Sequence, residues 1–140
     1  MSLINEQWQF TQHLALLPAK AKELSLMMTE GESYRTPFQA WANSLPPLSH
    51  IEAHLRDGQV LEFSGTVGGA GINHSTHCNR LGKDFNFFTS DGKLINTKTP
   101  GLIELGNYWE GLDPKNRWGG NFKPTTARPC GDLYHFERSV

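Results

Sequence analysis

Residues 74–88, HSTHCNRLGKDFNFF, predict the strand around which the fold is organised. Side chains of a strand point alternately to its two faces, so one face should carry Asp84, Asn86 and Phe88. The other face should carry Phe85 and Phe87, which are typical of a buried surface. An acidic residue at the head of such an apolar strand is costly to bury unless it is paired or bound to a metal.

A second stretch, residues 131–137 with the sequence GDLYHFE, reads as a short aromatic strand near the end of the chain. Together with the first stretch it offers His77, Asp84 and His135, two nitrogen ligands and one oxygen ligand. A catalytic zinc ion takes three such protein ligands and keeps one position open. His74, three residues before His77, is an alternative ligand. Asp132 leaves the turn before the strand, where it either serves as a base beside the metal or only forms the turn.

Helix and strand signals surround these two stretches. Apolar residues at offsets of four and three predict a helix from Phe10 to Leu24, and Pro18 should kink it or divide it in two. Residues 25–35 are expected to hold an early strand. Thr36-Pro37 resembles an N-cap followed by proline and predicts a short helix through about Ser44.

The segment from Pro46 to Asn73 lacks a clear period and contains several glycines. We interpret it as a long loop that forms a lid or wall over a cleft, with a helix possible over residues 49–55. Asp91-Gly92 predicts a turn into a second strand at residues 93–96. Thr99-Pro100 predicts the start of another helix.

Size and composition indicate one soluble domain over residues 1–140. The chain is 37% hydrophobic and 19% charged, with a formal net charge of -1. This balance argues against nucleic acid or an anionic membrane as a partner, and no apolar run approaches the roughly 20 residues of a membrane span. The first nine residues lack the pattern of a secretory signal, so we expect synthesis in the cytoplasm. Cys78 and Cys130 are expected to be free thiols.

The two stretches resemble the zinc motif of bacterial and phage peptidoglycan peptidases, which include D-alanyl-D-alanine carboxypeptidases and L-alanyl-D-glutamate endopeptidases. That motif is Ser-x-His, six residues, then Asp, and later Asp or Glu, two residues, then His. It matches Ser75, His77, Asp84, Asp132 and His135 in order. Residues 32–39, ESYRTPFQ, look like the family's Glu-x-x-Arg-Thr-x-x-Gln segment, and residues 107–122 look like the tryptophan-rich stretch of its endopeptidase branch. The resemblance runs from about residue 10 to residue 136.

The chain departs from the family at a few positions. Gly82 stands where the family usually has alanine, a change that should preserve packing. Asn121 stands where the endopeptidase branch commonly has aspartate, and this difference bears on substrate preference. None of the departures falls on a predicted metal ligand.

The resemblance implies a role for each matching residue. His77, Asp84 and His135 would bind one Zn²⁺, whose bound water has a pKa lowered from 15.7 to about 7. Asp132 would be the general base, and Arg35 would stabilise the oxyanion unless it forms a structural ion pair with Glu32. Ser75, Gln39 and Trp118 are the expected substrate contacts. Nitrogen and oxygen ligands also accept manganese, cobalt or nickel.

For the fold, the resemblance implies an α+β domain of the hedgehog and D-alanyl-D-alanine peptidase type, with a central antiparallel sheet bearing the zinc site and helices on one side. For the function, it implies hydrolysis of peptidoglycan stem peptides between L-alanine and D-glutamate by a monomeric, phage-type endolysin. Such an enzyme reaches the wall after the membrane is breached. The alternatives are a D-alanyl-D-alanine carboxypeptidase or dipeptidase, and a zinc-stabilised binding module without activity.

Overall fold

The computed structural model describes residues 1–31, 33–37, 40, 48–67 and 75–140. Three α-helices, six β-strands and two 3-10 helices lie in this described part. In chain order they are α1 (Leu3–Leu14), α2 (Leu17–Glu23), β1 (Met27–Glu30), β2 (Leu48–His54), β3 (Val60–Val67), η1 (Thr76–Asn79), β4 (Gly82–Phe88), α4 (Pro100–Leu112), β5 (Asn116–Trp118), η2 (Gly119–Asn121) and β6 (His135–Arg138). The fold is therefore α+β, as the sequence predicts.

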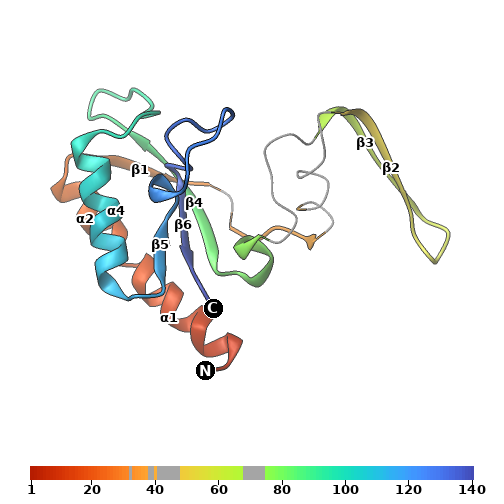
Figure 1. The fold of residues 1–140 in the computed structure, drawn as a ribbon, viewed down its shortest axis with the longest axis horizontal. Coiled ribbons are helices and arrows are strands. Elements are labelled where there is room, and N and C mark those ends of the chain that lie inside the picture. The colour runs from red at the N-terminus through yellow and green to blue at the C-terminus, as the bar shows by residue number, and fades with distance from the viewer. Residues whose placement is uncertain (32, 38–39, 41–47, 68–74) are drawn as a thin grey trace.

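The central sheet is antiparallel, with the strand order β1-β4-β6-β5 among the described residues. The alternation predicted for β4 is confirmed: Phe85 and Phe87 are buried, and Asp84 and Asn86 are half-buried on the other face. Phe136 of β6 packs against both phenylalanines. These rings join a core to which α1, α2 and α4 contribute, and Figure 1 shows these helices on one side of the sheet.

The helix signals are confirmed where the structure describes them. The expected helix around Pro18 is two helices, α1 and α2, with Pro18 in the first turn of α2, where its missing N–H costs nothing. Pro100 opens α4 in the same way after Thr99. The helix expected after Thr36 lies mostly outside the described residues. Its described part, Pro37 and Ala40, is helical, and the Ala40 N–H bonds to the Thr36 carbonyl at 3.0 Å.

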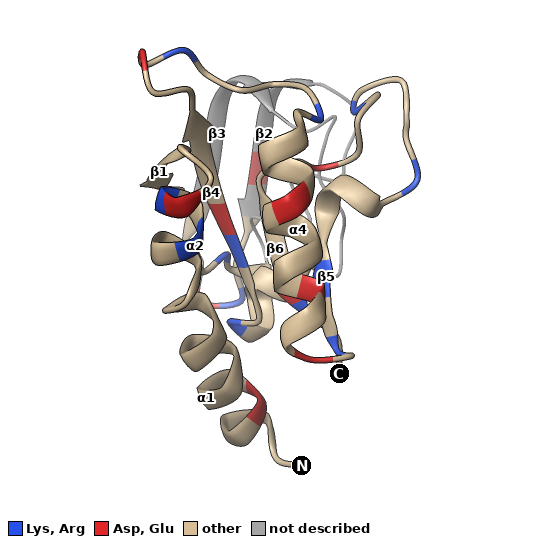
Figure 2. Ribbon diagram, turned by 90° about the vertical axis from the view of Figure 1, so that its left-hand side faces the viewer, with Lys and Arg blue, Asp and Glu red and all other residues tan. Residues whose placement is uncertain are grey.

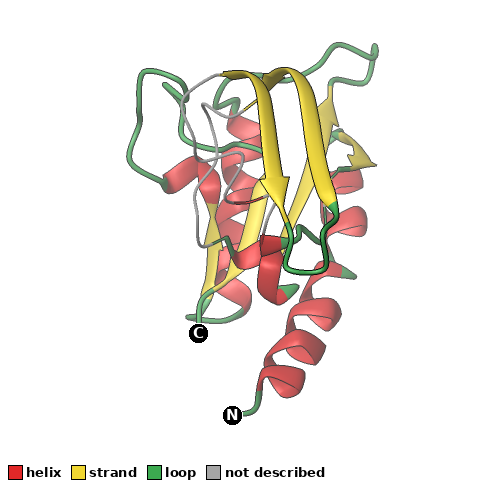
Figure 3. Cartoon of the chain, turned by 90° about the vertical axis from the view of Figure 1, so that its right-hand side faces the viewer, coloured by secondary structure: helices red, strands yellow, loops and turns green. Residues whose placement is uncertain are grey.

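The prediction of a long loop over residues 46–73 is wrong for residues 48–67, the part that the structure describes. Residues 48–67 form an antiparallel hairpin of β2 and β3, which stands apart from the central sheet in Figure 1 and faces the viewer in Figure 3. The helix expected over residues 49–55 is therefore also wrong. Residues 55–59 form the connection, with Gly58 at a φ of 86° and the Asp57 carboxylate accepting the Gln59 N–H at 3.0 Å. Asp-Gly is a hairpin signal because glycine adopts positive φ without strain.

The turn after β4 is confirmed, but the strand expected at residues 93–96 is reduced to one isolated bridge. Gly92 has a φ of 85°, and the Thr89 N–H bonds to the Lys93 carbonyl at 2.8 Å. Leu94 pairs with Phe88 as a single bridge. The chain then turns away towards α4.

A buried ion pair joins the two ends of the chain. The Glu6 carboxylate of α1 accepts bonds of 2.6 Å from Arg138 of β6 and from Lys115, and Arg138 also reaches Asp113 at 3.1 Å. Elsewhere Figure 2 shows acidic and basic residues interspersed along the described ribbon. None of the helices in the described ranges is long and apolar enough to span a membrane.

This ion pair predicts how stability depends on pH. Hydrogen bonds from Lys115 and then Arg138 hold the pKa of Glu6 below its ordinary value of 4.5. A carboxyl group with a lowered folded-state pKa stabilises the fold above its unfolded pKa, and the stabilisation is lost as pH falls through the folded pKa. We expect Glu6→Gln to lower the melting temperature of the metal-free protein at pH 7 and to flatten its decline below pH 4.5.

Circular dichroism melts of the metal-free protein between pH 7 and pH 3 would measure this. Glu23→Gln is the matched control, because the Glu23 side chain is 68% exposed and pairs with Lys20 across a turn of α2. If the melting temperatures of the wild type and of Glu6→Gln fall equally steeply as pH is lowered, the prediction is contradicted.

Candidate metal centre

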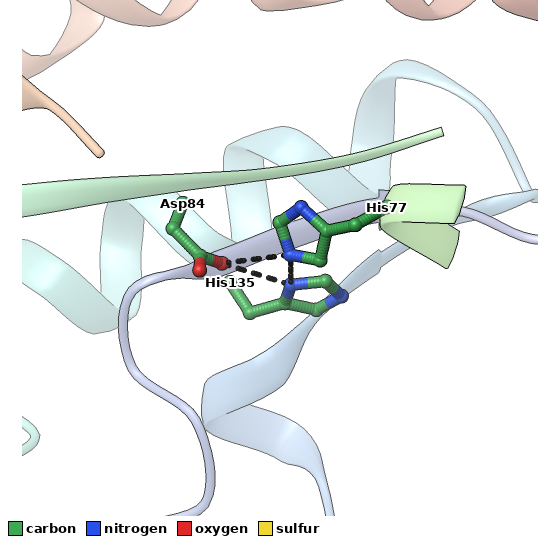
Figure 4. A group of neighbouring side chains, drawn as sticks. All are labelled: His77, Asp84 and His135. Atoms are coloured by element: carbon green, nitrogen blue, oxygen red, sulfur yellow. Dashed lines mark hydrogen bonds and ion pairs between the residues drawn. The ribbon is translucent and has the colours of Figure 1, made fainter. Parts of the chain in front are cut away.

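The structure brings His77, Asp84 and His135 together at one point (Figure 4). The Nε2 atom of His77 lies 3.1 Å from the Nδ1 atom of His135. The Oδ1 atom of Asp84 lies 3.3 Å from the first nitrogen and 3.0 Å from the second. The three side chains could hold a metal ion, and the two histidines are buried.

Local structure explains this convergence. Asp84 of β4 and His135 of β6 are direct partners across two antiparallel strands, so their side chains leave the sheet on the same face. His77 comes from η1, just before β4. The Ser75 hydroxyl caps η1 by accepting the His77 N–H at 3.2 Å, and Arg80 ends it at a φ of 58°. The chain then enters β4 with His77 next to Asp84.

The outward nitrogen of each histidine has a partner that only accepts hydrogen bonds. His77 Nδ1 lies 2.7 Å from the Ser33 carbonyl oxygen, and His135 Nε2 lies 2.9 Å from the Glu137 carboxylate. Each of these nitrogens must therefore carry the proton and donate it. When both rings are neutral, each inward nitrogen is unprotonated. Its lone pair points towards the other ring's inward nitrogen and towards the Asp84 carboxylate. Three acceptors this close need a cation between them, either a proton or a metal ion.

The electrostatics of the site agree with a cation between these three acceptors. Burial alone would lower the pKa of His135, but hydrogen bonds with Asp84 and Glu137 outweigh burial and raise the pKa to about 9. Burial would raise the pKa of Asp84, but hydrogen bonds with His135 and His77 hold it well below its usual range. In the metal-free protein, a proton on His135 therefore supplies the missing positive charge. Metal binding must displace that proton.

Glu137 is a functional candidate that the sequence motifs do not include. It is 7% exposed, and besides His135 its carboxylate accepts the Thr76 hydroxyl at 3.1 Å and pairs with Arg117 at 3.3 Å. Burial would raise its pKa, but the hydrogen bond with His135 lowers it. A signal exists in the sequence, because His135 and Glu137 are two residues apart on one strand. A carboxylate in this position fixes the ring and makes its inward nitrogen a stronger ligand.

We expect Glu137→Gln to weaken metal binding by about 10- to 100-fold while leaving the three ligands in place. The amide is neutral, so it stabilises a positively polarised imidazole less well than the carboxylate does. Competition with a chromophoric chelator would measure the affinity. Glu104→Gln, an exposed glutamate on α4, is the control. Unchanged affinity in Glu137→Gln would show that Glu137 does not tune the metal site.

Gly82 sits where the structure tolerates no side chain without movement. A Cβ atom there would lie 2.5 Å from the Thr76 hydroxyl and 3.0 Å from the His135 ring. The alanine that the resembling family usually carries would therefore displace Thr76 here. Exchanging glycine and alanine at position 82 therefore changes the packing around Thr76 and His135.

A cleft of about 140 Å³ opens beside the three candidate ligands. Asp132 and Arg35, the two predicted catalytic residues, both line it, together with Phe122 and Arg128. The Asp132 N–H bonds to the Gly119 carbonyl at 2.7 Å, and the Asp132 carbonyl accepts the His135 N–H at 3.1 Å. These bonds hold Asp132 beside the metal group, and its carboxylate forms an ion pair with Arg128.

The remaining predicted site residues have different outcomes. The Arg35 N–H bonds to the His77 carbonyl at 3.4 Å, which places Arg35 next to η1. Ser75 lines the cleft and caps η1, so its described role is structural. Gln39, Glu32 and the rival ligand His74 lie outside the described residues.

Trp118, which is predicted to contact the substrate, is a buried residue of β5. It is 1% exposed in the core, and its indole N–H bonds to the Leu133 carbonyl at 2.9 Å. Gly106 of α4 and Gly120 make room for it, since a Cβ atom on either would overlap the indole ring. A large apolar ring beside small residues is better explained by packing than by recognition.

Both cysteines of the chain are described, and neither forms a disulfide. Cys78 belongs to η1 and Cys130 to the loop before β6, and both are half-buried.

Comparison with known proteins adds no family to these observations. No protein-family model matches the chain, and no curated protein matches it. The function is therefore inferred from the geometry of the site and from the motifs of the sequence.

Proposed function

We propose that this chain is a zinc-dependent peptidase that hydrolyses peptidoglycan stem peptides between L-alanine and D-glutamate, with the hedgehog and D-alanyl-D-alanine peptidase fold. The observation that carries the proposal is the group of His77, Asp84 and His135 beside a cleft that Asp132 also lines. A closed structural zinc site has four protein ligands, whereas a catalytic site has three and an open position. Within the described residues the group has three members.

The spacing of the ligand atoms supports zinc. Ligands about 2.0–2.1 Å from a tetrahedral ion lie about 3.3 Å from one another. The three separations here are 3.0, 3.1 and 3.3 Å. Calcium would need six to eight oxygen ligands at longer distances, and magnesium favours oxygen ligands. Two imidazoles and one carboxylate at these separations favour zinc, with manganese, cobalt and nickel as the competing ions.

Each side chain then has a chemical task. When bound, zinc would polarise a water molecule and the substrate carbonyl. Asp132, which lines the cleft without belonging to the ligand group, would take a proton from the attacking water and deliver it to the leaving amine. Arg35 would bind the oxygen of the attacked carbonyl as negative charge develops on it. The outward bonds of His77 and His135 keep both rings oriented throughout.

The choice of peptidoglycan is supported by the sequence motifs, which match that peptidase family in order from about residue 10 to residue 136. The same resemblance supports a phage-type endolysin that is made in the cytoplasm and reaches the wall after the membrane is breached. Cleavage between L-alanine and D-glutamate is supported by the tryptophan-rich stretch, which resembles that of the endopeptidase branch.

Digestion of purified muropeptides, followed by mass spectrometry, tests the proposal. We expect release of the stem peptide from its L-alanine, loss of this activity with a chelator, and recovery on addition of zinc. Loss of only a terminal D-alanine would identify the rival carboxypeptidase. Bound zinc with no product from any muropeptide would favour a binding module instead.

A further inference from the structure

Arg128 lines the cleft, and neither the motif nor the metal chemistry gives it a role. Its guanidinium forms an ion pair with the carboxylate of Asp132, four residues later. The Arg128 side chain is 44% exposed and that of Asp132 is 22% exposed. In this structure the proposed base is therefore covered by a cation that an incoming ligand can reach.

The loop between η2 and β6 holds the backbone of Arg128 in place. Its N–H bonds to both the carbonyl and the hydroxyl of Thr125, at 3.2 and 3.0 Å, and its carbonyl accepts the N–H groups of Thr125 and Gly131 at 3.0 and 3.1 Å. These four hydrogen bonds, three of them between backbone groups, fix the position from which the side chain extends. The guanidinium thus has a defined reach over the mouth of the cleft.

The ion pair also borders a second hollow. This hollow has a volume of about 280 Å³ and is lined by Arg128 and Asp132 together with Asn96, Gly131 and Tyr134. Arg128 and Asp132 are the residues shared with the metal-side cleft, so the pair stands between the two. A peptide that runs from the metal into the second hollow must pass Arg128.

Such a peptide carries a negative charge close to the bond that is cut, where Arg128 could bind it. In a stem peptide D-glutamate is linked through its side chain, so its α-carboxylate stays free next to the bond to L-alanine. In the rival reaction, the terminal D-alanine likewise has a free carboxylate next to the bond that is cut. Either substrate therefore brings an anion to within one residue of the metal, and a planar guanidinium recognises a carboxylate with two parallel hydrogen bonds.

We propose that Arg128 binds the free carboxylate of the substrate residue on the leaving side of the scissile bond, and that it covers Asp132 until that carboxylate arrives. This proposal rests on the proposed function for the identity of the peptide. The substrate carboxylate replaces that of Asp132 on the guanidinium, and Asp132 is released to face the attacking water. One arginine thereby links recognition of an acidic substrate to exposure of the base.

Binding to the metal-free protein tests this without any turnover. The first pair of probes is the C-terminally amidated tripeptide L-alanyl-γ-D-glutamyl-L-lysine and the same peptide with the α-carboxylate converted to an amide. Isothermal titration calorimetry should give a dissociation constant about 10- to 100-fold lower for the acid than for the amide. In Arg128→Gln this preference should disappear, and Arg128→Lys should restore part of it.

A second pair of probes separates the two sources of the carboxylate. It consists of a stem pentapeptide with amidated D-glutamate that ends in D-alanyl-D-alanine, with either a free or an amidated C-terminus. A preference within the first pair alone assigns Arg128 to the glutamyl carboxylate, and a preference within the second pair alone assigns it to the terminal one. Arg56→Gln, which removes the same charge from the hairpin connection, is the control and should bind like the wild type.

The outcomes distinguish this proposal from the proposed function. The wild type could prefer the free carboxylate and Arg128→Gln lose that preference, while the zinc-loaded protein hydrolyses no peptide. This result would support the role of Arg128 and reject the peptidase. If the zinc-loaded protein hydrolyses the stem peptide but Arg128→Gln still prefers the free carboxylate over the amide, the peptidase is supported and the role of Arg128 is rejected. Failure of the wild type to prefer the acid in both pairs, or to bind any of the four peptides, would overturn the proposal for Arg128.

Discussion

Replacing Asp132 by asparagine is expected to lower kcat for stem-peptide hydrolysis by about 10²–10⁴-fold while zinc stays bound. Asparagine has nearly the same shape as aspartate, so the loop before β6 should keep its backbone bonds to Gly119 and His135. The amide cannot accept the proton of the attacking water. Because Asp132 is not one of the three grouped ligands, zinc content should remain at one ion per chain.

The measurement pairs a rate with a metal analysis on the same sample. Asp91→Asn, in the turn after β4, makes the same chemical change away from the site and should leave both quantities unchanged. A variant that loses zinc together with activity would make Asp132 a ligand, and one that retains full activity would remove it from the mechanism.

Parts of the fold can be predicted because their signals are local. Alternation from Asp84 to Phe88 identifies β4, and proline at the first helical turn identifies the starts of α2 and α4. The three candidate ligands are predicted from the zinc motif that residues 75–84 and 132–135 resemble, and the structure brings them together.

The hairpin of β2 and β3 shows how a local signal can be misinterpreted. Pro46 and the glycines around residues 65–69 suggest a loop when they are weighed by composition alone. Asp57-Gly58 lies between two runs that pair in register, with Ile51 opposite Phe63. The Asp-Gly dipeptide is the stronger signal, because its geometry suits a hairpin, whereas a high glycine content is compatible with many structures.

Other features could not be predicted, because they depend on contacts between distant segments. The Ser33 carbonyl fixes His77 from 44 positions away, and no spacing rule connects the two. The burial of Trp118, in β5, depends on Gly106 in α4. The Arg128–Asp132 pair is close in sequence, but its importance appears only when both residues are found to line the same cleft.

Replacing His135 by alanine is expected to weaken zinc binding by about 10³-fold. Roughly 12 kcal/mol of binding free energy shared by three protein ligands is about 4 kcal/mol for each, which corresponds to that factor. His135 also contacts Asp84 with one nitrogen and Glu137 with the other, so the substitution removes both contacts. In the wild type, free zinc at about 1,000 times its dissociation constant should stabilise the fold by about 4 kcal/mol. The variant should lose nearly all of this stabilisation.

Thermal melts with and without zinc measure the effect directly, because an ion that binds only the native state raises the melting temperature. His54→Ala, on the hairpin and 71% exposed, controls for zinc held by surface histidines and should respond to zinc as the wild type does. In the metal-free His135→Ala protein, Asp84 and Glu137 lose the cation between them, so the fold itself could be weakened. Asp84→Asn provides the second variant, since it keeps the shape of the ligand and leaves the His135–Glu137 pair intact. A rise in melting temperature as large as that of the wild type in both variants would mean that zinc binds elsewhere on the chain.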